Sequence, residues 1–190
     1  MIRILLMEDD IDFCYLICYA IEKEADMQIV SMCHTCEEAL RQIKQQNADI
    51  ALCDLSLQSN ELDGIQAARS LRLLSDAKVI ILSAYEDSDI VMKSCKESFA
   101  SCYIFKSQFE QLITSIRKTA QGPTPQAYMI RDAILSQLSS AEMAVFHMMM
   151  GEHIDLQSSA KTISNQKTSI LHKLGLKNQK ELQHIFHTYE

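Results

Sequence analysis

Asp54 is the residue of this sequence best placed to do chemistry, because it follows directly after the apolar run Ile50–Cys53. A short apolar run of this kind is typical of a strand that is buried on both faces, as in a parallel sheet. The residue after such a strand lies at its carboxyl end, where open α/β sheets place their ligand sites. Asp is also common at the start of an ordinary loop, so Asp54 alone would not indicate a site.

Three other apolar runs also end in polar or charged side chains. They are 2–7 before Glu8, Asp9 and Asp10, 78–82 before Ser83, and 101–105 before Lys106. If the four strands are parallel neighbours, carboxylates, a hydroxyl and an ammonium group converge in one cleft. Carboxylates this close repel one another and need a cation, and hard oxygen ligands suit Mg²⁺. With the metal and Lys106 stabilising charge on its oxygens, a phosphoryl group could be attacked in line by Asp54.

The sequence resembles those of the two-component response regulators, and residues 1–120 resemble their receiver domain. The pieces that carry the resemblance, in the family's order, are Glu8-Asp9, Asp54, Asp63-Gly64, Ser83-Ala84 and Lys106. The resemblance implies a doubly wound, flavodoxin-like α/β domain that a sensor histidine kinase phosphorylates. An aspartyl-phosphate hydrolase would need a second acid near Asp54 and a substrate cap. The sequence shows neither, so we expect a protein that is not an enzyme.

The same resemblance implies a role for each residue of the cleft. Asp54 would be the phospho-acceptor, and Tyr103 would be the aromatic switch. Ser83 and Lys106 would contact the phosphoryl group. The ligands of Mg²⁺, directly or through water, would be Glu8, Asp9, Asp54 and the backbone carbonyl of Ser56.

The composition is that of an ordinary soluble protein, with 47% hydrophobic and 23% charged residues. No apolar run approaches the ~20 residues that a membrane span needs. The N-terminal apolar run is also too short for a signal peptide, so we expect a cytoplasmic protein. The odd count of seven cysteines argues against a disulfide framework. Cys33 and Cys36 form a C-x-x-C pattern without a flanking Trp or Pro, and we interpret it as a strand-to-helix loop rather than a redox or metal site.

Strand and helix patterns alternate five times over residues 1–120. Strands are predicted near 2–7, 27–33, 48–53, 78–82 and 101–105. Helices are predicted near 10–24, 36–46, 62–75, 86–97 and 108–120. This alternation with short connections indicates a doubly wound sheet of five parallel strands.

The chain changes character near residue 121, where both of its prolines, Pro123 and Pro125, follow Gly122 within a few residues. Such a stretch is typical of a linker. Residues 1–120 hold 12 basic and 19 acidic side chains, whereas residues 121–190 hold six of each. We expect a receiver domain over 1–120, a linker and connecting helix over 121–137, and a small all-α domain over 138–190.

Three helices are predicted in this last segment. Ser139 and Glu142 form a capping box, Ser159 and Gly175 bound the middle helix, and Asn178 caps the last one. The apolar face of the middle helix consists of Ile163, Ile170, Leu171 and Leu174. Its opposite face carries Lys161, Ser164, Asn165, Thr168 and His172. Short hydrogen-bonding side chains of this kind suit a helix that enters the DNA major groove.

Residues 138–187 resemble the LuxR-type helix-turn-helix, most closely at its recognition helix and the turn that follows. The resemblance places Ser164, Asn165 and Thr168 toward bases, and Lys161, Thr162 and Lys177 toward phosphates. Only seven residues separate Gly151 from Ser159, so the positioning helix of the family is reduced to roughly one turn.

Two hypotheses follow from these resemblances. The first is a response regulator that phosphorylation switches to a homodimer and to DNA binding for transcription control. The second is a phospho-receiver whose shortened helical domain contacts protein rather than DNA. Within 156–180 there are five lysines and no acidic residue, which favours the first hypothesis.

Overall fold

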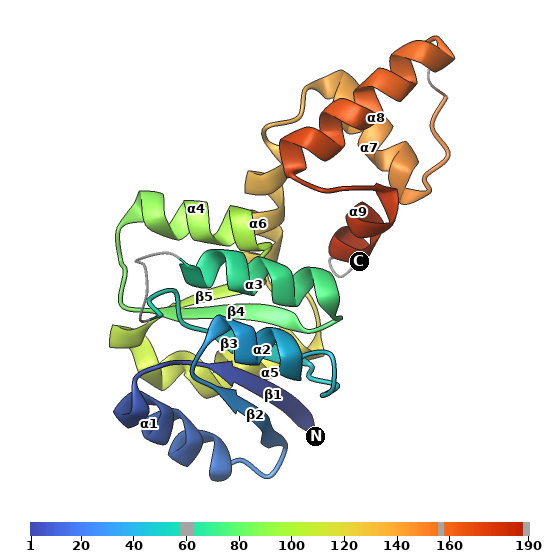
Figure 1. Cartoon of the computed structure of the whole chain (residues 1–190). Helices are drawn as coiled ribbons and strands as arrows, with labels where there is room; N and C mark the ends of the chain where they lie inside the picture. The colour runs from blue at the N-terminus through green and yellow to red at the C-terminus, as the bar shows by residue number, and fades with distance from the viewer. Residues whose placement is uncertain (58–62, 156–157, 188–190) are drawn as a thin grey trace. The chain divides into compact units, whose positions relative to one another are not determined.

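The computed structural model describes residues 1–57, 63–155 and 158–187. Two compact units make up the chain, Met1–Ile130 and Arg131–Glu190, and helix α6 (Pro125–Leu135) contains the boundary between them (Figure 1). None of the helices in the described ranges is both long enough and apolar enough to span a membrane.

Within the described residues, the first unit is built on a sheet of five parallel strands in the order β2-β1-β3-β4-β5 (Figure 1). The strands are β1 (Ile2–Met7), β2 (Met27–Cys33), β3 (Ile50–Cys53), β4 (Lys78–Ser83) and β5 (Cys102–Phe105). The central strand β3 is buried throughout because helices cover both faces of the sheet, which explains its continuous apolar sequence. The predicted doubly wound parallel sheet is confirmed.

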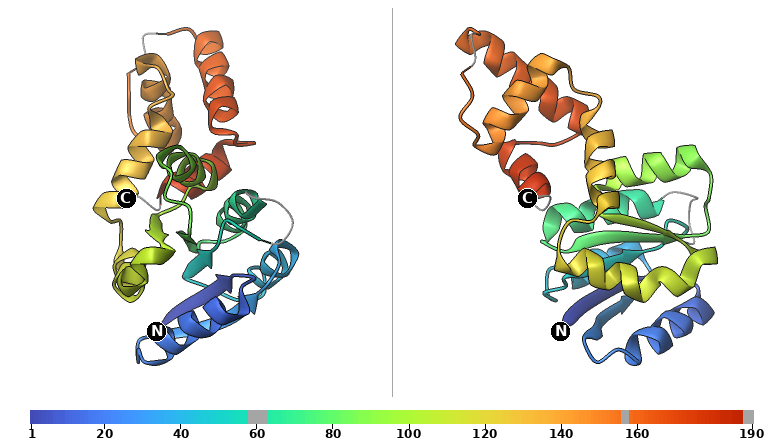
Figure 2. Two further views of the ribbon diagram at one scale, coloured as in Figure 1. Left: turned by 90° about the vertical axis from the view of Figure 1, so that its left-hand side faces the viewer. Right: turned by 180° about the vertical axis from the view of Figure 1, so that it is seen from behind.

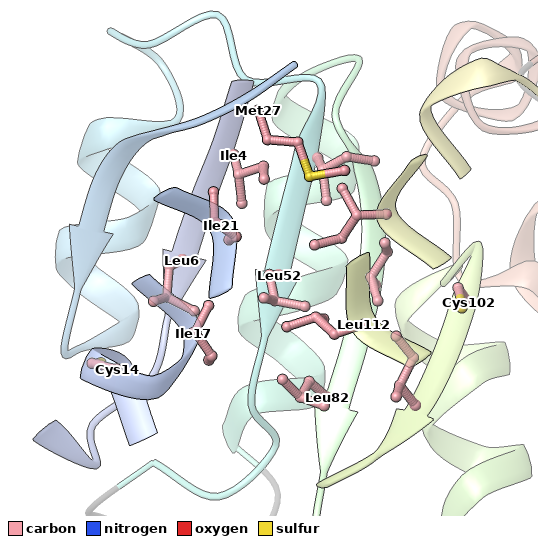
Figure 3. Close-up of a cluster of buried hydrophobic side chains, with 14 residues drawn as sticks. Ile4, Leu6, Cys14, Ile17, Ile21, Met27, Leu52, Leu82, Cys102 and Leu112 are labelled. Carbon is pink, nitrogen blue, oxygen red and sulfur yellow. The ribbon is translucent and has the colours of Figure 1, made fainter. Parts of the chain in front are cut away.

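Helices pack on both faces of this sheet (Figure 2). Their bounds are α1 (Ile11–Glu22), α2 (Cys36–Gln42), α3 (Asp63–Leu74), α4 (Ser88–Ser98) and α5 (Leu112–Gln121). Helices α1 and α5 share one face, where Ile17 and Leu112 meet strand residues such as Leu6 and Leu52 in a single apolar cluster (Figure 3). Helices α2, α3 and α4 lie on the other face.

Short polar caps start the helices close to the carboxyl edge of the sheet. The side chains of Asp10 and Asp87 each accept from two backbone amides, of α1 and α4 respectively, and the Thr35 side chain accepts from one backbone amide of α2. The predicted start of the helix near 108–120 is wrong, because a 3₁₀ helix over Lys106–Gln111 precedes α5 where one continuous helix from residue 108 was expected. Gln108 lies in it with a non-helical backbone, so the α-helix begins only at Leu112.

The described part of the second unit contains the end of α6 and the helices α7 (Ser140–Met150), α8 (Ala160–Leu174) and α9 (Gln179–Phe186). The predicted capping box is present, since the side chains of Ser139 and Glu142 each accept from the other residue's backbone amide. Ser159 and Asn178 cap α8 and α9, also as predicted. The helices pack around Phe146, which is buried. Its ring packs edge-on against the buried ring of Phe186, with 5.0 Å between the two ring centres.

The connection between α7 and α8 differs from the expected helical turn. Residues 152–155, which the structure describes, are not helical, and Gly151 ends α7 in the left-handed conformation. Helix α8 packs on α7, and Ile170 and Leu174 on its apolar side are buried.

Candidate functional site

Asp54 and Glu8 lie side by side at the carboxyl edge of the sheet because their strands pair in register. Met7 pairs with Cys53, and the backbone N–H of Asp54 donates to the Met7 carbonyl at 2.9 Å. The residue that follows each strand therefore reaches the same level. Both residues are buried, with Glu8 1% and Asp54 5% exposed.

Asp9 completes a cluster of three carboxylates with these two residues. One oxygen each from Glu8, Asp9 and Asp54 lies within 4.8 Å of the other two. Oxygen ligands at this spacing fit a hard divalent cation such as Mg²⁺, which binds one or two protein carboxylates and keeps several waters. The carbonyl of Ser56 stays a predicted fourth ligand, and Ser56 is exposed between the buried residues Leu55 and Leu57.

Lys106 provides a positive charge beside two of the carboxylates. Its Nζ lies 2.8 Å from Glu8 Oε2, 2.9 Å from Asp54 Oδ2 and 4.3 Å from the centre of the Phe13 ring. Burial raises the pKa of Glu8 to about 7, and the Asp54 charge adds to the rise while Lys106 opposes it. Burial alone would lower the pKa of Lys106, but its hydrogen bonds to Glu8 and Asp54 outweigh burial and raise it.

Ser83 and Tyr103 come from the two strands beyond β3. Ser83 is the last residue of β4 and is fully buried, and Tyr103 lies on the adjacent strand β5. The Tyr103 hydroxyl donates to the backbone carbonyl of Tyr85 at 2.8 Å. Burial raises the pKa of Tyr103 to about 12, and a hydrogen bond with the Ser83 side chain opposes that rise. The structure thus brings the predicted switch residue into contact with the predicted phosphoryl-contacting hydroxyl.

Close packing at the start of α3 requires a glycine at position 64, directly after Asp63. A Cβ atom at this position would lie 2.4 Å from the Asp54 carbonyl oxygen and 2.6 Å from Leu55 Cα, closer than such atoms can approach. The Gly64 amide also donates to the Leu55 carbonyl at 3.3 Å. The helix start is therefore packed directly on the backbone that carries Asp54.

Two residues of the site were not predicted from the sequence. The Cys14 thiol donates to the Glu8 carbonyl at 3.4 Å, and Nδ1 of His34 lies 3.0 Å from the same oxygen. They come from α1 and from the loop after β2, and together they hold the backbone at Glu8. Neither position carries a local sequence signal, because each contact depends on how distant segments pack.

In the second unit, α8 presents the predicted polar face to solvent. Lys161, Ser164, Asn165, Thr168 and His172 are all exposed, whereas Ile170 and Leu174 on the opposite side are buried. The predicted phosphate-facing residues Thr162 and Lys177 are exposed as well. The Thr162 hydroxyl is bonded to the Ser159 hydroxyl at 2.9 Å, so it is partly engaged within its own helix.

Lys173 is paired with a carboxylate of α7. Its Nζ lies 2.7 Å from Glu142 Oε2, and the Ser169 hydroxyl donates to Glu142 Oε1 at 2.7 Å. The hydrogen bond from Lys173, followed by those from Ser139 and Ser169, lowers the pKa of Glu142 to about 2. This cluster opens into a polar groove of about 400 Å³, lined by Ser139, Glu142, Thr162, Asn165, Gln166, Ser169 and Lys173.

Comparison with known proteins places these features in a family. The chain is 27% identical over 149 residues to the transcriptional regulatory protein LiaR of Bacillus subtilis, covering 77% of this chain and 70% of LiaR. The crystal structure of a LuxR-family two-component response regulator from Aurantimonas sp. SI85-9A1 is also similar, with 25% sequence identity and a TM-score of 0.59. The match covers 71% of this chain and 96% of the Aurantimonas chain.

A third similarity extends over nearly the whole chain. RcsB from Salmonella enterica serovar Typhimurium, solved bound to promoter rprA in the presence of the phosphomimetic BeF₃⁻, is 18% identical, covers 98% of each chain and has a TM-score of 0.57. These comparisons confirm the predicted resemblance to LuxR-type response regulators. The protein-family model of the response regulator receiver domain matches residues 4–117 of the sequence, and the chain belongs to this family of two-component response regulators.

Proposed function

We propose that this response regulator accepts a phosphoryl group on Asp54 from a sensor histidine kinase and, once modified, controls transcription by binding DNA. The observation that carries the first part is the cluster of Glu8, Asp9 and Asp54 within 4.8 Å, with Lys106 bound to two of them. Asp54 is the carboxylate of this cluster that follows the central strand β3, with two neighbouring strands on either side.

In the proposed reaction, a carboxylate oxygen of Asp54 attacks phosphorus. The new O–P bond forms as the P–N bond to the kinase histidine breaks, and the imidazole leaves. Mg²⁺ bound at the predicted ligands would neutralise charge on the phosphoryl oxygens. Lys106 Nζ already lies 2.9 Å from Asp54 Oδ2, and the Leu55 amide donates to Oδ1 at 2.6 Å, so the acceptor carboxylate is held in one orientation.

The test of the acceptor is Asp54→Asn, labelled by a small phosphodonor such as acetyl phosphate in the presence of Mg²⁺. Asp12→Asn is a matched control, because Asp12 is exposed on the first turn of α1. We expect intact-mass spectrometry to find one phosphoryl group on the wild type and the control and none on the variant. Stoichiometric labelling of Asp54→Asn would remove Asp54 from this role.

DNA binding is the output that the second unit supports best. The exposed face of α8 offers Ser164, Asn165 and Thr168 for base edges, and Lys161 and Lys177 are exposed near its two ends. The relatives point the same way, since LiaR is named as a transcriptional regulator and RcsB is solved bound to a promoter. A homodimer that reads two half-sites would need only a moderate interface from each subunit.

Protein binding is the second candidate output, and two observations favour it. The described residues 152–155 contain no positioning helix to cross the DNA backbone, and Lys173 is already paired with Glu142. Selection of genomic fragments by the phosphorylated protein at low salt separates the two outputs. Enrichment of a sequence supports DNA binding, and no enrichment at any salt concentration supports a protein partner.

A further inference from the structure

The outer edge of β5 is paired by a side chain rather than by a strand. Strand β5 is last in the sheet, and among the described residues only β4 pairs with it. Backbone groups on such an edge need another partner. Gln126 supplies one, because its Oε1 accepts from the Tyr103 amide at 3.3 Å and its Nε2 donates to the Tyr103 carbonyl at 3.2 Å. The side-chain amide therefore pairs with Tyr103 as the backbone of a sixth strand would.

The residue that Gln126 pairs with is the one that contacts the phosphorylation site. The Tyr103 side chain is buried, and its hydroxyl is bonded to the Tyr85 carbonyl and interacts with Ser83. Tyr103 is consequently held from two directions. Its ring is held by the segment that leaves β4, and its backbone is held by Gln126.

Gln126 itself belongs to the first turn of α6. The helix begins at Pro125, and the Thr124 side chain accepts from the Ala127 amide at 3.1 Å. Ala127 and Ile130 are buried, so this turn is packed rather than free. The start of α6 thus sets the position of the Gln126 side-chain amide. A movement of β5 at Tyr103 would be transmitted through this amide to the first turn of α6.

We propose that Gln126 couples the state of the phosphorylation site to the start of α6, an inference that rests on the proposed phosphorylation of Asp54. A phosphoryl group that draws Ser83 toward it leaves space that Tyr103 fills, which holds Tyr103 in the buried position. That position is the one in which both hydrogen bonds to Gln126 are made. Phosphorylation therefore strengthens the pairing and protects the first turn of α6.

The coupling is reciprocal, because two linked equilibria change each other by the same factor. If phosphorylation protects the start of α6, then loss of the Gln126 amide must also weaken phosphorylation. Gln126→Leu removes both hydrogen-bonding atoms and leaves an apolar side chain that is one bond shorter. Gln126→Glu keeps an acceptor for the Tyr103 amide but sets an oxygen against the Tyr103 carbonyl, so it should behave like the Leu variant.

The experiment is amide hydrogen exchange of the full chain, with and without the phosphodonor and Mg²⁺, followed at residues 127–130. In the wild type, phosphorylation should slow exchange there about fivefold or more, which is the lower end of usual coupling. The Gln126 variants should show little change and should hold less phosphoryl group at equilibrium with the donor. Gln121→Leu is the matched control, because Gln121 is exposed at the end of α5 and should behave as the wild type does.

The possible outcomes separate the coupling from the proposed function. Intact mass reports phosphorylation independently of exchange, so an unlabelled wild type would overturn the phosphorylation and the coupling with it. A labelled wild type whose 127–130 segment exchanges as before would overturn the coupling alone, as would a Gln126→Leu variant that responds like the wild type. Unchanged exchange in β1, β3 and β4 verifies that each variant is folded.

Discussion

At the scale of single residues, Lys106 sets the electrostatic balance of the carboxyl edge. One ammonium group lies against two buried carboxylates, 2.8 Å from Glu8 and 2.9 Å from Asp54, with Asp9 beside them. Buried charges are tolerated only where they are paired. The cleft is therefore short of positive charge, which a divalent cation would supply, and it holds Lys106 ready for a further anionic group.

Gly64 leads to a prediction at the same scale. Gly64→Ala would force a Cβ atom to within 2.4 Å of the Asp54 carbonyl oxygen, so either the start of α3 or the backbone at Asp54 must move. We expect a loss of about 1–3 kcal/mol in the free energy of unfolding, as for other overpacked sites. Urea unfolding followed by circular dichroism measures it, and phosphorylation by acetyl phosphate should slow because Asp54 is displaced.

Gly122→Ala is the control for this prediction. A Cβ atom at Gly122 would have no atom within 4 Å, and the φ angle of 166° is extended backbone that any residue adopts. Its unfolding midpoint and its phosphorylation rate should match those of the wild type. Equal midpoints for the two alanine variants would contradict the close packing of α3 on the Asp54 backbone.

At the scale of elements, the strands and the helix caps could be predicted from the sequence. Features that depend on packing between distant segments could not. Each strand of the sheet was located within two residues of its observed start, because buried apolar runs and polar caps are local signals. The 3₁₀ helix after Lys106 and the early end of α2 at Gln42 carry no such signal. Residues that follow strand ends were predicted to converge, whereas the contacts of Cys14 and His34 with Glu8 arise only in the folded chain.

Glu142 on α7 is bonded to Ser169 and Lys173 on α8, and these contacts predict that the stability of the second unit depends on pH. The pKa of Glu142 is lowered from 4.5 to about 2, so the charged form stabilises the folded unit. A lowered carboxyl pKa contributes stability that is fully present above about 4.5 and is lost as the pH falls toward 2. Acid should therefore weaken the packing of α8 on α7.

The measurement compares the wild type with Glu142→Gln in urea at several pH values. The variant should be less stable at neutral pH, and its stability difference from the wild type should shrink as the pH falls below 4.5. Glu152→Gln is the control, since Glu152 is 57% exposed and pairs only with His147 at the surface among the described residues. A difference that does not change with pH would exclude the Glu142 charge as its source.

The exposed face of α8 makes a separate prediction about DNA. Asn165→Ala or Thr168→Ala should lower discrimination between sequences, by about 1–3 kcal/mol for each lost base contact. Lys161→Ala and Lys177→Ala should weaken binding to all sequences alike and reduce the salt dependence by about one ion per phosphate contact. Binding isotherms at several salt concentrations separate the two classes. Identical effects of Asn165→Ala and Lys161→Ala would count against the assigned faces.

At the scale of the whole molecule, charge is divided unequally between the two parts of the chain. All of the net charge of −7 comes from residues 1–120, because residues 121–190 hold equal numbers of acidic and basic side chains. Two acidic receivers repel each other, and a phosphoryl group adds a further −1.5 to −2 or so to each. A neutral output domain attracts DNA only weakly, so one copy alone gains little from phosphates.

These charges shape the prediction that phosphorylation produces a homodimer. We expect the movement of Ser83, and the filling of its space by the already buried Tyr103, to reshape the surface formed by α4 and β5, and the new surface must outweigh the added repulsion. Sedimentation velocity should therefore show a dimer only with the phosphodonor and Mg²⁺, and more of it at physiological salt than at low salt, because charges beyond about 8 Å are then screened. Asp54→Asn with the same phosphodonor should sediment as the unphosphorylated protein does. Equal sedimentation of labelled and unlabelled wild type, over a range of protein concentrations and at both salt levels, would mean that phosphorylation acts within a single chain.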